Sequence, residues 1–228
     1  MGTQGPGGGS PCQPFPERIT HAQQAVLEPF KAKRRPSRVD REALEDALDT
    51  AASESDMQVL LERHPSLLAA TVKGNHGTWV LRQVRLGSAY VPDFLMASEA
   101  SAGVGRHLVE LESPKARLTN PGNQRESPTL RAALHQIHDW REWLSENLPA
   151  AQKKWPGITP QSRGLIIMGR EDPTDRAEGI RDRISRESRI EIRTYDWLIR
   201  AAEGEGLAHL GLLDLETEDP DLSAWFDW

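Results

Sequence analysis

Three acidic residues occur in a pattern that could bind a metal ion and support hydrolysis. Asp93 lies in the segment 91–96, and Glu110 and Glu112 lie two positions apart in the segment 107–112. Both segments have the apolar content of short β-strands, and a spacing of two in a strand puts both glutamates on one face. If the two strands are neighbours, Asp93 reaches the same face, and the three carboxylates converge.

A convergent carboxylate cluster favours a divalent cation. Like charges at close range raise one another's pKa or require a positive ion between them. Hard oxygen ligands in a partly hydrated site suit Mg²⁺, with Mn²⁺ as an alternative. Such an ion can activate water and stabilise the charge that develops during phosphodiester hydrolysis. The other interpretation is a set of acidic residues at solvated strand ends, and the spacing alone does not separate the two.

Hydrophobic periodicity predicts the elements that position these residues. Asp40 is expected to cap a first helix, a second helix runs from about Ser55 to His64, and Ser127-Pro128 begins a long amphipathic helix that ends near Pro149. Residues 97–105 are small and polar, which suits a hairpin-like connection. We expect strands at 78–85, 91–96, 106–111, 165–168 and 190–193, and further helices at 66–72, 175–187 and 194–199.

The order of these elements predicts an α/β fold with a mixed central sheet flanked by helices. Three regions follow from composition. Residues 1–39 form a leader that is rich in Gly and Pro, then basic, and is predicted to be disordered; residues 40–203 form one folded domain; residues 204–228 form an acidic tail with an aromatic end.

Composition narrows the class of protein. The chain of 228 residues has one cysteine, which cannot form an internal disulfide, so we expect a reducing, cytoplasmic location. No apolar stretch approaches the roughly 20 residues of a membrane span. The net charge is −6, but residues 204–228 carry seven acidic and no basic side chains, which leaves the rest at −6 + 7 = +1. Bulk charge therefore neither supports nor excludes a DNA substrate.

Five ordered segments resemble one known family. They are VPDFLM from residue 91, HLVELESPKARL from 107, LRAALHQIHDWREWL from 130, RGLIIMGR from 163 and IEIRTYDWLIRA from 190. Together they are similar to the core of the Shedu-type anti-phage defence proteins, the DUF4263 family, over about residues 55–203. That family is placed in the PD-(D/E)xK nuclease superfamily, so the resemblance implies a restriction-endonuclease-like core.

The resemblance also implies roles for individual residues. Asp93 and Glu110 would bind the metal ion, and Gln136 on the long helix would face the site. Glu62 would match an acidic residue that some members of the superfamily use as a further ligand. The implied function is a Mg²⁺-dependent DNA endonuclease in defence against phage, working as a homo-oligomer, either a dimer or a tetramer.

Glu112 departs from the superfamily pattern, which has Lys at this position. A Lys orients water and stabilises negative charge, whereas a Glu can accept a proton or bind a cation. Three interpretations stay open: an active enzyme that uses Glu112 as base or ligand, an enzyme in which Lys115 replaces the missing Lys, or a catalytically silent module that binds nucleic acid or a partner protein.

Basic and aromatic residues suggest further contacts. Lys115, Arg117 and Arg131 are expected to contact DNA phosphates along the rim of the site, or else to belong to an ordinary charged loop. The tail, which ends in residues 225–228, is expected to dock on this chain or on a partner, or to pack on its own domain. His107 is expected to face away from the carboxylates as a packed or exposed side chain.

Overall fold

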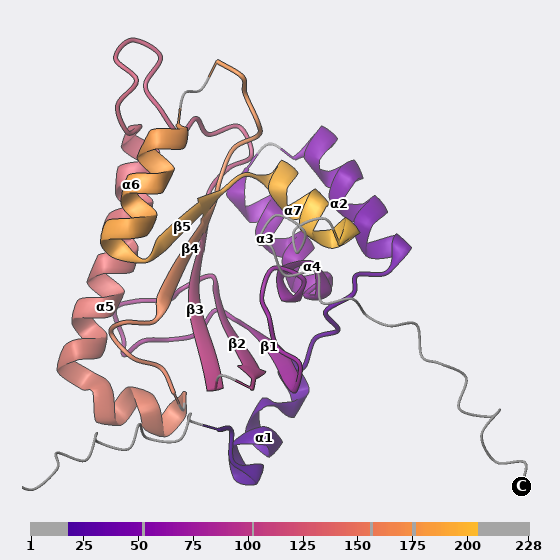
Figure 1. Cartoon of the computed structure of the whole chain (residues 1–228), viewed down its shortest axis with the longest axis vertical. Coiled ribbons are helices and arrows are strands. Elements are labelled where there is room, and N and C mark those ends of the chain that lie inside the picture. Colours follow the sequence, from indigo (N-terminus) through magenta and orange to yellow (C-terminus); the bar gives the residue numbers. More distant parts are fainter. Residues whose placement is uncertain (1–17, 52, 102, 156, 175–176, 205–228) are drawn as a thin grey trace, which may run out of the picture.

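The computed structural model describes residues 18–51, 53–101, 103–155, 157–174 and 177–204. Residues 1–17 of the leader and residues 205–228 of the tail lie outside this range, as do the predictions made for them. Residues 18–39, which were predicted to belong to the disordered leader, contain helical segments at 21–27 and 28–30 and the start of a helix at residue 38. The fold is α/β, with a five-stranded mixed sheet flanked by helices, as predicted (Figure 1). Its helices are α1 (His21–Leu27), η1 (Glu28–Phe30), α2 (Arg38–Thr50), α3 (Glu54–Arg63), α4 (Ser66–Ala69), α5 (Pro128–Lys154), α6 (Glu178–Ser188) and α7 (Tyr195–Glu203).

The sheet combines an antiparallel half with a parallel half. Its strands are β1 (Gly77–Arg82), β2 (Phe94–Ala100), β3 (Gly103–Leu111), β4 (Arg163–Ile167) and β5 (Ile190–Arg193), and they lie side by side in chain order. Strands β1, β2 and β3 pair antiparallel, whereas β4 runs parallel to both β3 and β5. Parallel neighbours need a long crossover, and α5 and α6 lie in these two connections.

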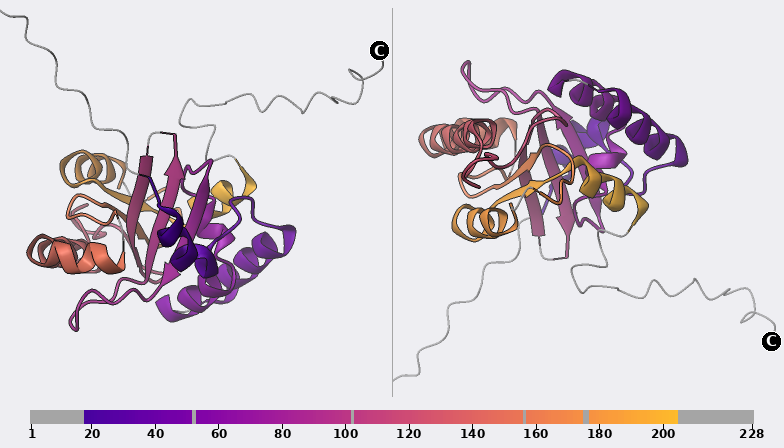
Figure 2. Two further views of the ribbon diagram at one scale, coloured as in Figure 1. Left: turned by 90° about the horizontal axis from the view of Figure 1, so that it is seen from below. Right: turned by 90° about the horizontal axis from the view of Figure 1, so that it is seen from above.

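Helices cover both faces of the sheet. Helices α5 and α6 lie on one face, and α2, α3, α4 and α7 lie on the other (Figure 2). Alternation along each strand builds two hydrophobic layers, because successive side chains point to opposite faces. In β3, Leu108 packs in the layer under α5, and Val109 packs in the layer under α7.

Several predicted boundaries of elements were wrong, among them those of the first long helix and of the second strand. Helix α2 begins at Arg38, because Ser37 is the N-cap and Asp40 completes a capping box at the third helical position. Strand β2 begins three residues later than the predicted strand and continues to Ala100. It does so because residues 97–99 pair with both neighbouring strands and Ala100 pairs with β3, so the hairpin is shorter than the predicted 97–105 connection.

The long helix also continues beyond its predicted end. Asn147 has non-helical backbone angles, and the chain resumes helical geometry through Lys154, with Pro149 just after the kink. Proline is tolerated in the first turn of a helix, where its missing N–H would have no partner. Strands β4 and β5 and the Thr194-capped helix α7 confirm the strands predicted at 165–168 and 190–193 and the helix predicted after Thr194. Within the described residues, no helix is long and apolar enough to cross a membrane.

Candidate active site

The register of the sheet brings Asp93 and Glu110 together. Phe94 pairs with Val109, so Asp93, which precedes β2, lies beside Glu110 near the end of β3. The Leu111 N–H donates to Asp93 Oδ2 over 2.8 Å, and the side chains of Asp93 and Glu110 are hydrogen-bonded to each other. Glu110 is only 5% exposed. Two of the predicted acidic residues therefore form a pair in which Glu110 is buried and Asp93 is partly buried.

The environment of this pair favours its protonated forms. Burial raises the pKa of Glu110 to about 9, with further contributions from the charges of Asp93 and Glu112. Burial also raises the pKa of Asp93 to about 6, against the opposing effect of the Leu111 N–H. These raised pKa values favour a pair that carries one proton near neutral pH. This is the state expected of adjacent carboxylates without a cation.

Glu112 follows β3 and is held through its backbone. Its N–H donates to the Ile167 carbonyl over 2.9 Å, which extends the pairing of β3 with β4 by one residue. Its carbonyl accepts a hydrogen bond from the Tyr195 hydroxyl over 2.9 Å. Burial raises the pKa of the half-buried Glu112 side chain to about 7, and the charges of Glu54 and Asp93 contribute to the shift.

Tyr195 is a positioning residue that the sequence did not indicate. Its side chain is 0% exposed, and its backbone N–H donates to the Gly169 carbonyl over 3.1 Å. Burial, with nearby carboxylates, raises the pKa of Tyr195 well above its ordinary value, so the hydroxyl remains a donor to the Glu112 carbonyl. The Thr194 cap predicted the start of α7, but not this contact with a residue 83 positions earlier.

Helix α3 contributes acidic charge from a different residue than expected. Glu62, the predicted ligand, forms an ion pair with Arg82 over 3.2 Å, and its charge acts on Asp93. Glu54, the first residue of α3, raises the pKa of Asp93, Glu110 and Glu112. The predicted helix began at Ser55, so Glu54 was missed. The capping pattern of Ser53 and Asp56 is the signal that places Glu54 in the first turn.

Gln136 is not brought to the carboxylates. It is exposed on α5, and no hydrogen bond joins it to Asp93, Glu110 or Glu112 within the described residues. Its neighbour Ile137 packs closely on Gly164, which pairs with β3 two residues before Glu110. The part of α5 that carries Gln136 is therefore nearer the start of β4 than its end.

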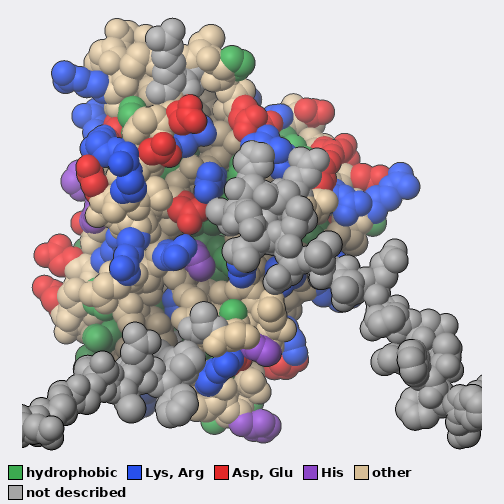
Figure 3. Space-filling view, viewed as in Figure 1, with side chains coloured by type: hydrophobic (Ala, Val, Ile, Leu, Met, Phe, Trp, Pro, Cys, Tyr) green, Lys and Arg blue, Asp and Glu red, His purple; other side chains and the backbone are tan. Residues whose placement is uncertain are grey.

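The predicted phosphate-contacting residues lie in separate places. Lys115 is exposed, and its charge is not among those that set the pKa values of Asp93, Glu110 and Glu112. Arg117 forms an ion pair with Asp172 over 3.0 Å. Arg131 lines a surface pocket near the start of α5. Lys and Arg side chains are interspersed with Asp and Glu along the α6 side of the molecule (Figure 3).

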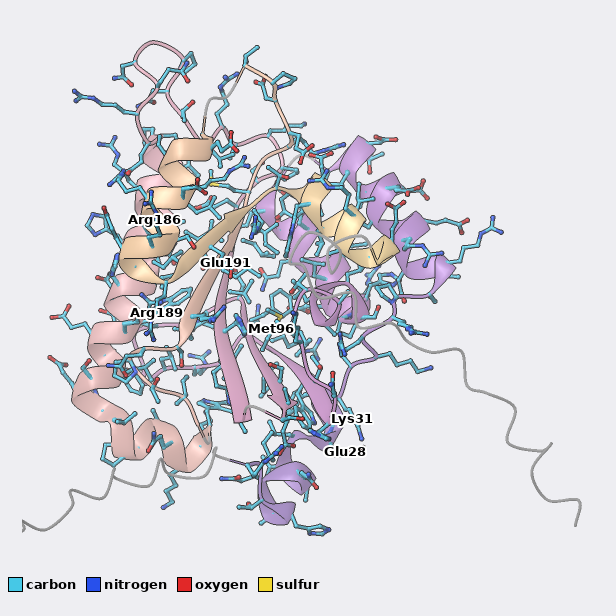
Figure 4. The ribbon with its side chains drawn as sticks, in the orientation of Figure 1. Glu28, Lys31, Met96, Arg186, Arg189 and Glu191 are labelled. Atoms are coloured by element: carbon cyan, nitrogen blue, oxygen red, sulfur yellow. The ribbon has the colours of Figure 1, made fainter. Side chains whose placement is uncertain are left out.

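His107 lies on the other face of the sheet, as predicted. It pairs with Met96 in the strand register, and Glu191 comes from β5 nearby (Figure 4). Burial lowers the pKa of His107 to about 4, with Arg163 contributing, so the imidazole is neutral near pH 7. Its Nδ1 atom is buried without a hydrogen-bond partner among the described residues. It takes no part in the carboxylate cluster.

The donor set fits a hard divalent cation. The described residues hold no group of three or more His, Cys, Asp or Glu side chains that is arranged to hold a metal ion as it stands. Mg²⁺ commonly needs only one or two carboxylates, and water and substrate phosphate complete its shell. Asp93 and Glu110 would supply two such ligands, and a cation would take the place of a proton on the pair.

Comparison with known proteins identifies the family. No curated protein and no solved structure matches the chain significantly. The family model described as Shedu protein SduA, C-terminal, matches residues 51–199, a range that includes all five strands and the three clustered acidic residues. The match spans well over half of the chain, and it confirms the resemblance found in the sequence. The chain therefore belongs to the family of the Shedu protein SduA C-terminal domain, a family of anti-phage defence proteins.

Proposed function

We propose that this protein is a metal-dependent DNA endonuclease that hydrolyses phosphodiester bonds in anti-phage defence. The observation that carries the proposal is the pair of the partly buried Asp93 and the buried Glu110, with Glu112 beside it at the end of β3. Asp93 and Glu110 would hold Mg²⁺ or Mn²⁺. The bound ion would supply Lewis-acid stabilisation of the negative charge on the phosphate.

Glu112 is the candidate proton acceptor. Ile167 and Tyr195 form hydrogen bonds with the Glu112 backbone, so the backbone position of Glu112 is fixed two residues after Glu110. As a general base, its carboxylate would accept a proton from the attacking water. Lys115 is less well placed to substitute for the missing Lys, because it is exposed and does not influence the carboxylates.

Cleavage of plasmid and linear DNA tests this proposal. We expect metal-dependent cutting by the wild-type protein and a loss of at least about 100-fold in both Asp93→Ala and Glu112→Ala, as for removal of a ligand or a general base. Glu142→Ala, which changes an exposed glutamate on α5, is the matched control and should cut normally. Loss in Asp93→Ala alone would retain the nuclease and remove Glu112 from the mechanism.

The second candidate function is a catalytically silent module that binds nucleic acid or a partner protein. It is favoured because Glu112 stands where the superfamily has Lys. The charges that contribute to the raised pKa of Glu112 come from the acidic residues Glu54 and Asp93. In the same assay, DNA binding without cutting under Mg²⁺ or Mn²⁺ would support this function and contradict the nuclease.

A further inference from the structure

A basic pocket lies apart from the carboxylates, between the loop that follows Glu112 and helices α5 and α6. It has a volume of about 290 Å³. Its lining includes three arginines, one glutamate and two uncharged residues: Gln124, Arg125, Glu126, Arg131, Ile180 and Arg183. None of these residues belongs to the acidic cluster, so the pocket is a separate feature of the surface.

The pocket is built on a tightly held loop. Thr119 and Glu126 form an isolated β-bridge, and the Asn120 N–H donates to the Arg125 carbonyl over 2.8 Å. The Asn120 side chain also donates to the Glu126 carbonyl over 3.1 Å. Ser127 then caps α5, so the loop leads directly into the helix that carries Arg131. These contacts fix the backbone positions of Arg125 and Arg131.

The charges of the pocket favour an anion. Arg183 is paired with Glu126 over 2.5 Å and lies 3.7 Å from Glu187. No ion pair or side-chain hydrogen bond is present for the Arg125 and Arg131 guanidinium groups in the part of the chain that the structure describes. The lining therefore carries three positive charges and one negative charge. Two guanidinium groups at one pocket suit a phosphate, which accepts paired hydrogen bonds from arginine.

We propose that the pocket formed by Arg125, Arg131 and Arg183 binds a phosphate group of the nucleic-acid backbone, away from the bond that is cut. The identity of the polymer rests on the proposed function. The loop 113–127 leaves the end of β3 that carries Glu110, and it projects beyond that end of the sheet together with the start of α5 (Figure 1). One DNA strand could therefore contact both sites.

The test is DNA binding without cleavage, measured by fluorescence anisotropy of a labelled duplex in EDTA. We expect Arg125→Gln and Arg131→Gln each to weaken binding by about five- to tenfold, and each to reduce the slope of log affinity against log salt by about one. Arg163→Gln is the control, because this exposed arginine lies at the start of β4, at the opposite end of the strands. It should bind as the wild type does.

The outcomes separate this inference from the nuclease proposal. Because binding is measured without metal, a protein that binds through the pocket and never cuts supports the pocket and contradicts only the nuclease. Pocket variants that bind DNA like the wild type overturn the pocket alone. Calorimetry with a nucleoside monophosphate completes the test. If the variant that combines Arg125→Gln and Arg131→Gln loses nucleotide binding but binds DNA like the wild type, the assignment to a polymer is overturned.

Discussion

The proton shared by Asp93 and Glu110 links the stability of the metal-free protein to pH. The folded-state pKa values of Asp93, Glu110 and Glu112 are about 6, 9 and 7, all above the ordinary values of carboxyl groups. Above about pH 4, the unfolded chain therefore loses protons that the folded chain retains. The folded state binds more protons in this window, so the free energy of unfolding falls as the pH rises towards 9.

Replacing Glu110 by glutamine should reduce this dependence. The amide can still donate a hydrogen bond to Asp93, but it removes the charge that burial penalises. We expect Glu110→Gln to raise the free energy of unfolding by about 1–3 kcal/mol at about pH 8.5, and to flatten its slope with pH. Urea denaturation in EDTA from about pH 7 to about pH 9 measures both.

The pH range and a control make this result specific. His107 has a lowered pKa of about 4, so its contribution to stability is lost only as the pH falls below about 6.5, outside the measured range. Glu142→Gln should leave the slope unchanged, because that side chain is exposed. An unchanged slope in Glu110→Gln would mean that the carboxyl pair does not hold an extra proton.

The sequence predicted the site residues that lie on one strand or on adjacent strands, and it missed those that reach the site from distant helices. The two-residue period of a strand predicts that Glu110 and Glu112 share a face, and the pairing of adjacent strands adds Asp93. Glu54 and Tyr195 reach the same place from other elements, and Tyr195 does so across 83 residues. Such proximity depends on how helices pack on the sheet, which hydrophobic periodicity does not specify.

At the level of elements, prediction was accurate where a signal lies within the element itself. The apolar run in β4 and the cap of α7 predicted their positions well. Strand β2 was misplaced because its small residues, such as Ala97 and Ser98, become strand by pairing with β1 and β3 rather than by propensity. Helix α5 likewise continues past Pro149, a residue type that normally ends a helix, because the chain kinks at Asn147 and resumes helical geometry just before the proline.

At the scale of elements, the turn after β4 lies next to the residues that hold Glu112, because the Gly169 N–H donates to the Ser113 carbonyl. Gly169 has a φ of +64°, and a Cβ there would lie 2.3 Å from the Ala116 carbonyl oxygen. Its own carbonyl accepts the Tyr195 N–H. We expect Gly169→Ala to reduce the free energy of unfolding by about 2–4 kcal/mol, because it combines backbone strain with a steric clash. Urea denaturation measures the loss.

Gly179→Ala is the matched control for this substitution. Gly179 lies in α6, and nothing lies within 4 Å of the position of its added Cβ. Alanine is favoured over glycine in a helix by roughly 0.5–1 kcal/mol, so this variant should be as stable as the wild type or slightly more stable. Equal stability of the two variants would contradict the role given to the Gly169 turn.

At the scale of the whole molecule, charge is distributed unevenly along the chain. Residues 205–228 hold seven acidic and no basic side chains, and the remainder has 28 Lys and Arg against 34 − 7 = 27 Asp and Glu. The proposed DNA-binding surface, the arginine pocket, thus belongs to a nearly neutral body joined to an acidic segment. At low salt, we expect that segment to oppose the approach of DNA through electrostatic repulsion.

Removing the charge of this segment should therefore strengthen DNA binding. We expect the full chain with its seven tail carboxyl groups changed to amides to bind a duplex several-fold more tightly at about 0.05 M salt. The gain should shrink as salt rises, because the screening length falls from about 10 Å at 0.1 M to about 3 Å at 1 M. Anisotropy over a salt series measures this. A gain that persists at high salt would indicate that the acidic tail occupies the DNA-binding surface by direct contact, whereas no gain at any salt would place its charge beyond the reach of bound DNA.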